Sequence, residues 1–130
     1  MVLTKIGASL AGSAHTITVT QGSHGFVSND RGKAVKMTDS SGTPTYALAT
    51  ANTVANADAI GIITQVINAT TFIIALSGRI TIDDAVPNLA AGTVLFLPLT
   101  ANLGVVMGGT ASGHLTSTEP SAAGEVSKPM

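Results

Sequence analysis

Few side chains in this sequence carry the chemistry that catalysis or metal binding requires. The histidines are His15, His24 and His114, and each falls in or beside a predicted boundary between a strand and a turn. They could form a metal site only if the fold, or a three-fold axis between subunits, brought them together. We therefore expect them to be solvent-exposed or hydrogen-bonding side chains rather than metal ligands.

The acidic residues are similarly dispersed. In a strand, the adjacent pair Asp83-Asp84 would point to opposite faces and could not act as two paired carboxylates. The segment 29–32 favours a turn over a site. Asp30, Asp39 and Asp58 could each bind calcium, but none lies in an Asp-x-Asp-Gly type of loop. The carboxylates thus predict turns and loop starts.

Other signatures of activity are missing from the sequence. No Gly-x-Ser-x-Gly nucleophile elbow occurs, and Gly108-Gly109 is not followed by the lysine of a phosphate-binding loop. Asn68-Ala69-Thr70 matches a glycosylation sequon, but we interpret it as a hairpin turn. The six basic residues are spread out and aromatic residues make up 3%, which argues against nucleic-acid binding. We expect no enzymatic activity, no cofactor and no metal.

The composition favours a protein whose surface is largely covered by neighbours. The length of 130 residues supports one domain, and only 10% of the residues are charged, against about 25% in typical globular domains. A formal charge of −1 gives little repulsion between copies. Because cysteine is absent, subunit association is the obvious additional source of stability. The alternative is a secreted β domain with a Thr/Ser-rich exterior.

Two segments raise the question of a membrane. The apolar run of the N-terminal segment 1–14 is too short, and too rich in small residues, for the hydrophobic region of a signal sequence. Residues 85–118 contain no Asp, Glu, Lys or Arg, and 89–108 is long enough to span a bilayer. However, Pro98 and Asn102 interrupt that stretch, which favours a short buried strand. We expect a soluble or assembled protein rather than an inserted one.

The first half of the chain predicts short strands and tight turns. Residues 16–20 alternate threonine with branched apolar residues, which is typical of a half-buried strand. Residues 33–38 alternate again and lead through a polar turn at 39–42 to a return strand at 44–50. Residues 51–59 predict at most one irregular helical turn.

The second half predicts further strands. The strongest are 60–67 and 71–76, whose continuous β-branched runs suggest burial on both faces. A further strand is predicted at 79–82, followed by strands at 93–99 and 103–107 and an edge strand at 125–130. Seven to nine short strands without alternating helices predict an all-β fold. We expect a single compact β-barrel or β-sandwich domain over 15–130, preceded by a short extended N-terminal arm over 1–14.

A series of short segments also follows a recognisable order. These are His24–Phe26, Gly32–Val35, Tyr46–Ala49, Asn52–Ile63, Phe72–Gly78, Leu89–Leu97, Gly113–Pro120 and Gly124–Pro129. In this order and spacing, the chain from Ser23 to Met130 resembles a β domain that recurs in tailed-phage virion proteins: head-decoration, head-fibre and tail-fibre-associated proteins. It departs from that family at Phe96, where tyrosine is common, and at 105–112, which resembles an insertion.

The resemblance implies a structural role on a bacteriophage particle. It implies a capsid decoration or cement protein, a homotrimer on the capsid exterior that bridges subunits of the major capsid protein and stabilises the virion. The alternative is a head-fibre or tail-fibre component that contributes to host attachment. The short length favours decoration, because no room remains for a fibrous shaft. Neither nucleic acid nor a membrane is an expected partner, and 1–14 and 125–130 are the candidate contact elements.

Overall fold

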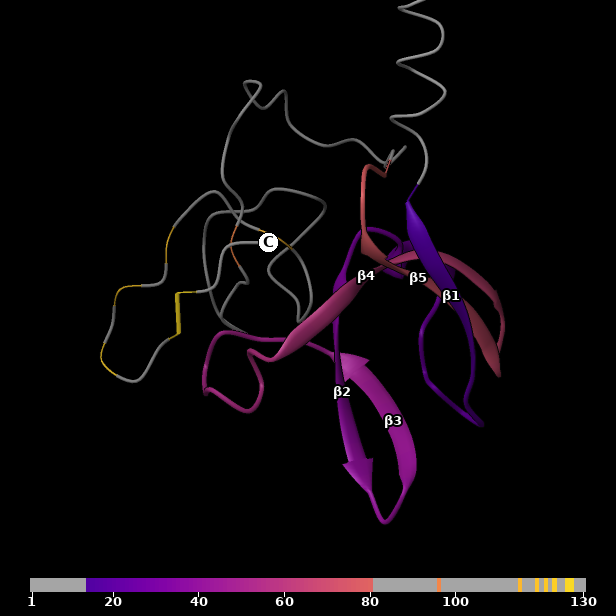
Figure 1. Ribbon diagram of the computed structural model, residues 1–130, viewed down its shortest axis with the longest axis horizontal. Coiled ribbons are helices and arrows are strands. Elements are labelled where there is room, and N and C mark those ends of the chain that lie inside the picture. Colours follow the sequence, from indigo (N-terminus) through magenta and orange to yellow (C-terminus); the bar gives the residue numbers. More distant parts are fainter. Residues whose placement is uncertain are drawn as a thin grey trace, which may run out of the picture.

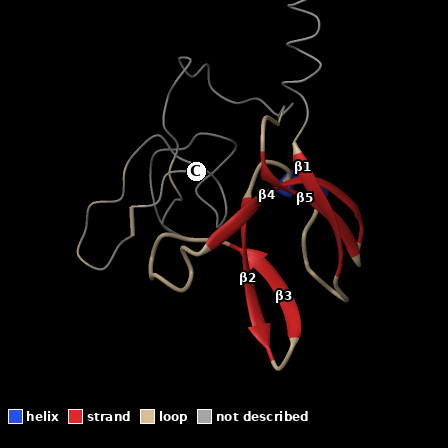
Figure 2. Cartoon of the chain, viewed as in Figure 1, coloured by secondary structure: helices blue, strands red, loops and turns tan. Residues whose placement is uncertain are grey.

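The protein is described here by a computed structural model, which places residues 14–80 and seven later ones. The later residues are Phe96, Leu115, Glu119, Ser121, Ala123, Val126 and Ser127. The regular elements are β1 (His15–Thr20), the 3-10 turn η1 (Ser28–Asp30), β2 (Ala34–Ser40), β3 (Thr43–Leu48), β4 (Ala59–Asn68) and β5 (Thr71–Ser77). The predicted all-β class is confirmed (Figures 1 and 2).

The strands form one antiparallel sheet with the order β1-β5-β4-β2-β3. β1 and β3 are therefore its two end strands. Within residues 14–80 no backbone ladder joins these end strands into a closed barrel. Figure 1 shows the β2–β3 hairpin extending away from the part of the sheet that contains β1 and β5. The result is a compact β domain built on a single sheet.

The alternation predicted for the first strand is present in β1. Val19 is buried and Ile17 packs against the same core, whereas Thr16, Thr18 and Thr20 are exposed. Because successive side chains of a strand point to opposite faces, this period of two places the branched apolar residues on the core side. The pairing of Val19 with Phe72 then fixes β1 against β5.

The predicted β2–β3 hairpin forms, but β2 continues to Ser40, so the turn is shorter than the predicted 39–42. Ser40 pairs with Thr43, so the turn consists of Ser41 and Gly42. Both turn residues have a left-handed backbone, with φ of 63° and 79°, as a type I′ hairpin turn requires. On the return strand Tyr46 and Leu48 lie on the same face and are both half-buried.

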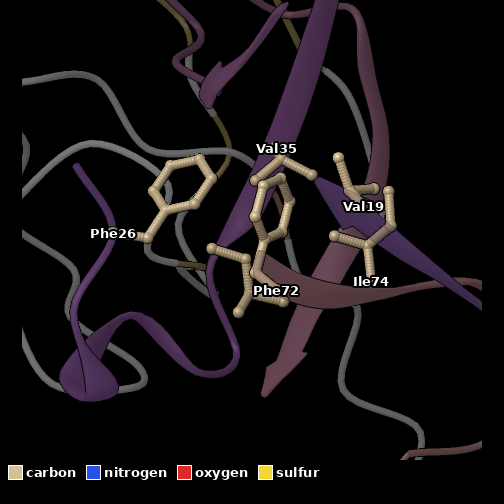
Figure 3. Packing of buried hydrophobic residues seen from close by; sticks show 6 residues of the cluster. Val19, Phe26, Val35, Phe72 and Ile74 are labelled. Carbon is tan, nitrogen blue, oxygen red and sulfur yellow. The ribbon is translucent and has the colours of Figure 1, made fainter. Parts of the chain in front are cut away.

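The sheet buries apolar side chains on both faces. One core cluster, partly shown in Figure 3, contains Val19, Phe26, Val35, Ile63, Phe72 and Ile74. The second contains Ala34, Ala49, Ala51, Ala57 and Leu115. The neighbours Ala34 and Val35 belong to different clusters because they point to opposite faces of β2. The sheet is therefore the middle layer between two apolar clusters, and Leu115 belongs to one of them.

Some strand predictions need correction. β4 is buried on both faces only near Ile62 and Ile63, whereas Gln65 and Ile67 are exposed, so double-sided burial is wrong for its second half. β5 is likewise exposed at its end. Arg79 and Ile80 form no strand, contrary to the expected strand at 79–82.

The remaining strand predictions lie mostly outside the described residues. The arm 1–14 is outside except for Ala14, and 81–95 and 97–114 are outside entirely. Phe96, within the expected strand 93–99, forms an isolated β-bridge. Val126 and Ser127, within the expected edge strand 125–130, are not in a strand. The backbone N–H of Val126 donates instead to the carbonyl of Ala51 at 2.8 Å.

The loop between β3 and β4 contains the single irregular turn expected at 51–59. The backbone N–H of Ala57 donates to the carbonyls of Thr53, at 2.9 Å, and Val54, at 3.2 Å. The buried residues Ala51 and Ala57 anchor both ends of this turn in the second core cluster. The loop is therefore a fixed part of the domain surface.

Candidate functional site

His24 is the only histidine of the three that lies in a buried position within residues 14–80. Its ring stacks on Phe26 with the centroids 5.1 Å apart and meets the edge of Phe72 at 4.9 Å. Phe26 and Tyr46 also contact Phe72 edge-on, at 4.9 and 5.7 Å. Figure 3 shows Phe26 next to Phe72 in this cluster. His24 thus belongs to an aromatic core and not to an open site.

Both ring nitrogens of His24 already have hydrogen-bond partners. Nδ1 accepts from the backbone N–H of Phe26 at 2.9 Å, so this nitrogen carries no proton. Nε2 therefore bears the proton and donates it to the carbonyl of Asn68 at 2.8 Å. The imidazole fastens the loop after β1 to the end of β4. The hydrogen-bonding role expected for the histidines is confirmed here, while His15 is exposed in β1 and His114 lies outside the described residues.

Two of the three candidate calcium ligands, Asp30 and Asp39, are used for local structure. Asp30 Oδ2 accepts from the backbone N–H of Val27 at 2.8 Å, and Oδ1 accepts from Lys33 Nζ at 2.5 Å. Asp30 and Lys33 are both buried. Asp39 Oδ1 accepts from the backbone N–H of Gly42 at 2.8 Å and closes the hairpin. Within the described part of the chain, no three metal-ligating side chains come together.

The segment 29–32 is a turn, as predicted. Its Asp30 ends η1, and the Arg31 guanidinium reaches across to the carbonyl of Thr64 in β4 at 3.0 Å. The sequon at 68–70 is also a turn: Asn68 Oδ1 accepts from the backbone N–H of Thr70 at 2.9 Å and from its hydroxyl at 3.0 Å. Asp83-Asp84 and Gly108-Gly109 lie outside the described residues.

The aromatic side chains offer little to a sugar-binding platform. Phe72 is fully buried, as expected, and Phe26 is 8% exposed. Tyr46 is half-buried against Phe72, and Phe96, which we expected to be buried, is half-buried. Three of the four rings therefore pack on one another in the core instead of forming an open stacking surface.

The most exposed large apolar side chain among the described residues is Val54, at 78%. It stands on the β3–β4 loop, where Asn52 Oδ1 accepts from the Thr50 hydroxyl and from the Asn56 amide, each at 2.9 Å. Lys36 Nζ donates to Asn56 Oδ1 and ties the loop to β2. This network joins the loop to β2, and a single exposed valine is usual on a protein surface.

The sequence did not predict a tertiary contact that Gln21 makes. Its side-chain amide forms two hydrogen bonds with the backbone of Tyr46, 25 residues away. Sequence gives no signal for such a contact, because a glutamine after a strand is equally compatible with exposure to solvent.

The chain matches no protein-family model, no curated protein and no solved structure. Among the described residues, no helix is long and apolar enough to cross a membrane. The assignment of function therefore depends on the sequence and on the chemistry of the described residues.

Proposed function

We propose that this chain is a non-enzymatic structural protein of a tailed-phage particle. In this proposal it decorates the outside of the capsid as a homotrimer, contacts the major capsid protein and bridges neighbouring capsid subunits. A ligand that binds only the assembled lattice stabilises that lattice by mass action. Trimerisation would add avidity across several weak contacts.

The observation that carries the proposal is how the polar side chains are used. In residues 14–80, His24, Asp30 and Lys33 are buried and bonded to backbone groups or to each other. The exposed surface carries threonine, serine and asparagine with few charges. Such a surface suits packing against neighbouring subunits better than it suits chemistry on a substrate.

The alternative, a fibre component that binds a host glycan, receives less support. Glycan sites commonly offer an exposed aromatic face beside polar groups, and Phe26, Tyr46 and Phe72 are instead packed together. Binding to a glycan array at useful affinity would reverse this order of preference.

The test is the number of copies of this chain in purified particles, measured by gel densitometry against the major capsid protein. We expect a ratio near one copy per capsid subunit. A handful or a few dozen copies per particle would replace decoration by a fibre or tail role. Absence from particles would overturn the virion proposal altogether.

A further inference from the structure

The Gln21 side chain contacts β3 in the way that a neighbouring strand would. Its Oε1 accepts from the backbone N–H of Tyr46 at 2.6 Å, and its Nε2 donates to the carbonyl of Tyr46 at 3.3 Å. A carboxamide carries the same donor and acceptor as a peptide group. The backbone N–H of Gln21 meanwhile donates to the carbonyl of Thr70 at 2.8 Å and extends the ladder between β1 and β5.

The strand register places this contact on the outer edge of β3. Tyr46 lies opposite Met37 in β2, and in an antiparallel pair alternate residues direct their backbone groups away from the partner. Because the groups of Tyr46 meet Gln21, those of Thr45 and Ala47 face β2. Since β3 is an end strand, Tyr46 offers its N–H and C=O at the edge where a further strand could pair.

A second feature of this edge points the same way. Pro44 lies two residues before Tyr46 and so has the same orientation, but it has no N–H to offer a neighbour. Prolines on edge strands limit pairing with other chains. Low net charge leaves this chain little repulsion to prevent such pairing.

We propose that the Gln21 carboxamide occupies the hydrogen-bonding groups of Tyr46 in place of a neighbouring strand. It thereby links the two end strands of the sheet and prevents a second copy of this chain from pairing with the β3 edge. It connects β1, through Gln21 itself, to β3, although the sheet has no ladder between these strands within residues 14–80. This role concerns the folded chain alone and does not depend on the proposed place in a virion.

The first test follows the backbone amides of β3 by residue-resolved hydrogen exchange. In the unaltered protein, the Tyr46 amide should be protected like those of Thr45 and Ala47, although it points away from β2. In Gln21→Ala, exchange at Tyr46 should rise at least about tenfold, while Thr45 and Ala47 change little. Gln65→Ala, at an exposed glutamine of β4, is the matched control and should leave Tyr46 protected.

A conservative variant separates the two hydrogen bonds. Gln21→Glu keeps an acceptor for the Tyr46 N–H but loses the donor to its carbonyl, so protection of Tyr46 should lie between the unaltered protein and the alanine variant. This variant and the unaltered protein keep the test decisive if Gln21→Ala does not fold. Rapid exchange at Tyr46 in the unaltered protein, or equal protection in Gln21→Ala, would overturn the proposal.

The second test measures self-association by sedimentation over a range of protein concentrations. Gln21→Ala should form species larger than those of the unaltered protein, increasingly so at higher concentration, whereas Gln65→Ala should not. If exchange at Tyr46 rises in Gln21→Ala but its sedimentation matches the unaltered protein throughout, protection of the edge is wrong and only the link between β1 and β3 stands.

Discussion

Gly61 lies where β4 and β5 approach too closely for a side chain. A Cβ atom at this position would lie 2.5 Å from the carbonyl oxygen of Ala75, a backbone atom that cannot rotate away. Gly61→Ala should therefore lower the free energy of unfolding by about 1–3 kcal/mol, as overpacking typically does. Chemical denaturation measures the loss. Gly22→Ala is the control, because nothing lies within 4 Å of the position that its Cβ would take, and equal losses in both variants would contradict this account.

The buried ion pair between Asp30 and Lys33 supports a second prediction about stability. Asp30→Ala would leave the buried ammonium of Lys33 without its carboxylate and should destabilise the protein by about 3–5 kcal/mol. The double variant Asp30→Ala/Lys33→Met removes both charges and should recover much of that loss, although the bond to Val27 stays broken. Denaturation curves of the two variants give the difference. A double variant no more stable than the single one would show that the hydrogen bond from Val27 to Asp30, and not the ion pair, matters.

Single residues show the limits of sequence reasoning most clearly. The interpretation of Asn68 and Asp39 as turn residues succeeded because their side chains bond backbone groups two or three residues away. His24 and Gln21 contact backbone 44 and 25 residues away. Such contacts depend on which strands become neighbours, and one sequence without the strand order does not contain that information.

At the scale of elements, the β2–β3 turn permits a stabilising change. Ser41 has a left-handed backbone, with φ of 63°, which a serine adopts at a cost and an asparagine tolerates better. Ser41→Asn should therefore raise the free energy of unfolding by about 0.5–1 kcal/mol. Ser41→Val should lower it, because a β-branched side chain is the least compatible with positive φ. Thermal unfolding of both variants checks that Ser41→Asn is the more stable of the two. A Ser41→Val protein as stable as Ser41→Asn would refute a type I′ turn.

Elements were predicted well where local pattern determines them. The alternation of apolar and polar residues predicted β1 and β2, and the turn residues predicted the β2–β3 and β4–β5 hairpins. The pattern failed in the second half of β4, where the apolar residue Ile67 is exposed although the run looks continuously buried. Periodicity reports which residues are apolar, but the cover that buries them comes from other parts of the chain.

At the scale of the whole molecule, the sheet order β1-β5-β4-β2-β3 could not be derived from the strands alone. The first strand pairs with the last one described and not with the next in sequence, β2. Such non-local pairing depends on matching two core clusters to the two faces of one sheet. An all-β class follows from pattern, whereas the order follows from packing.

Leu115 tests whether the late part of the chain belongs to the same folding unit as the sheet. It is 3% exposed and packs in the second core cluster with Ala34 of β2 and with Ala49, Ala51 and Ala57. Leu115→Ala should therefore lower the free energy of unfolding by about 2–5 kcal/mol, the usual result for a buried leucine. Leu76→Ala is the matched control: it removes the same atoms from a side chain that is 37% exposed, so its loss should be clearly smaller.

The positions at which Leu115→Ala accelerates amide exchange are as informative as its effect on the free energy of unfolding. Because Leu115 packs on Ala34 and its neighbours, amide exchange should accelerate in β2 and β4 together, in one cooperative transition. A loss confined to residues near 115, with the sheet amides unchanged, would mean that residues 14–80 fold as an independent unit. In that case the second core cluster would be an accessory layer and not part of the core that holds the sheet together.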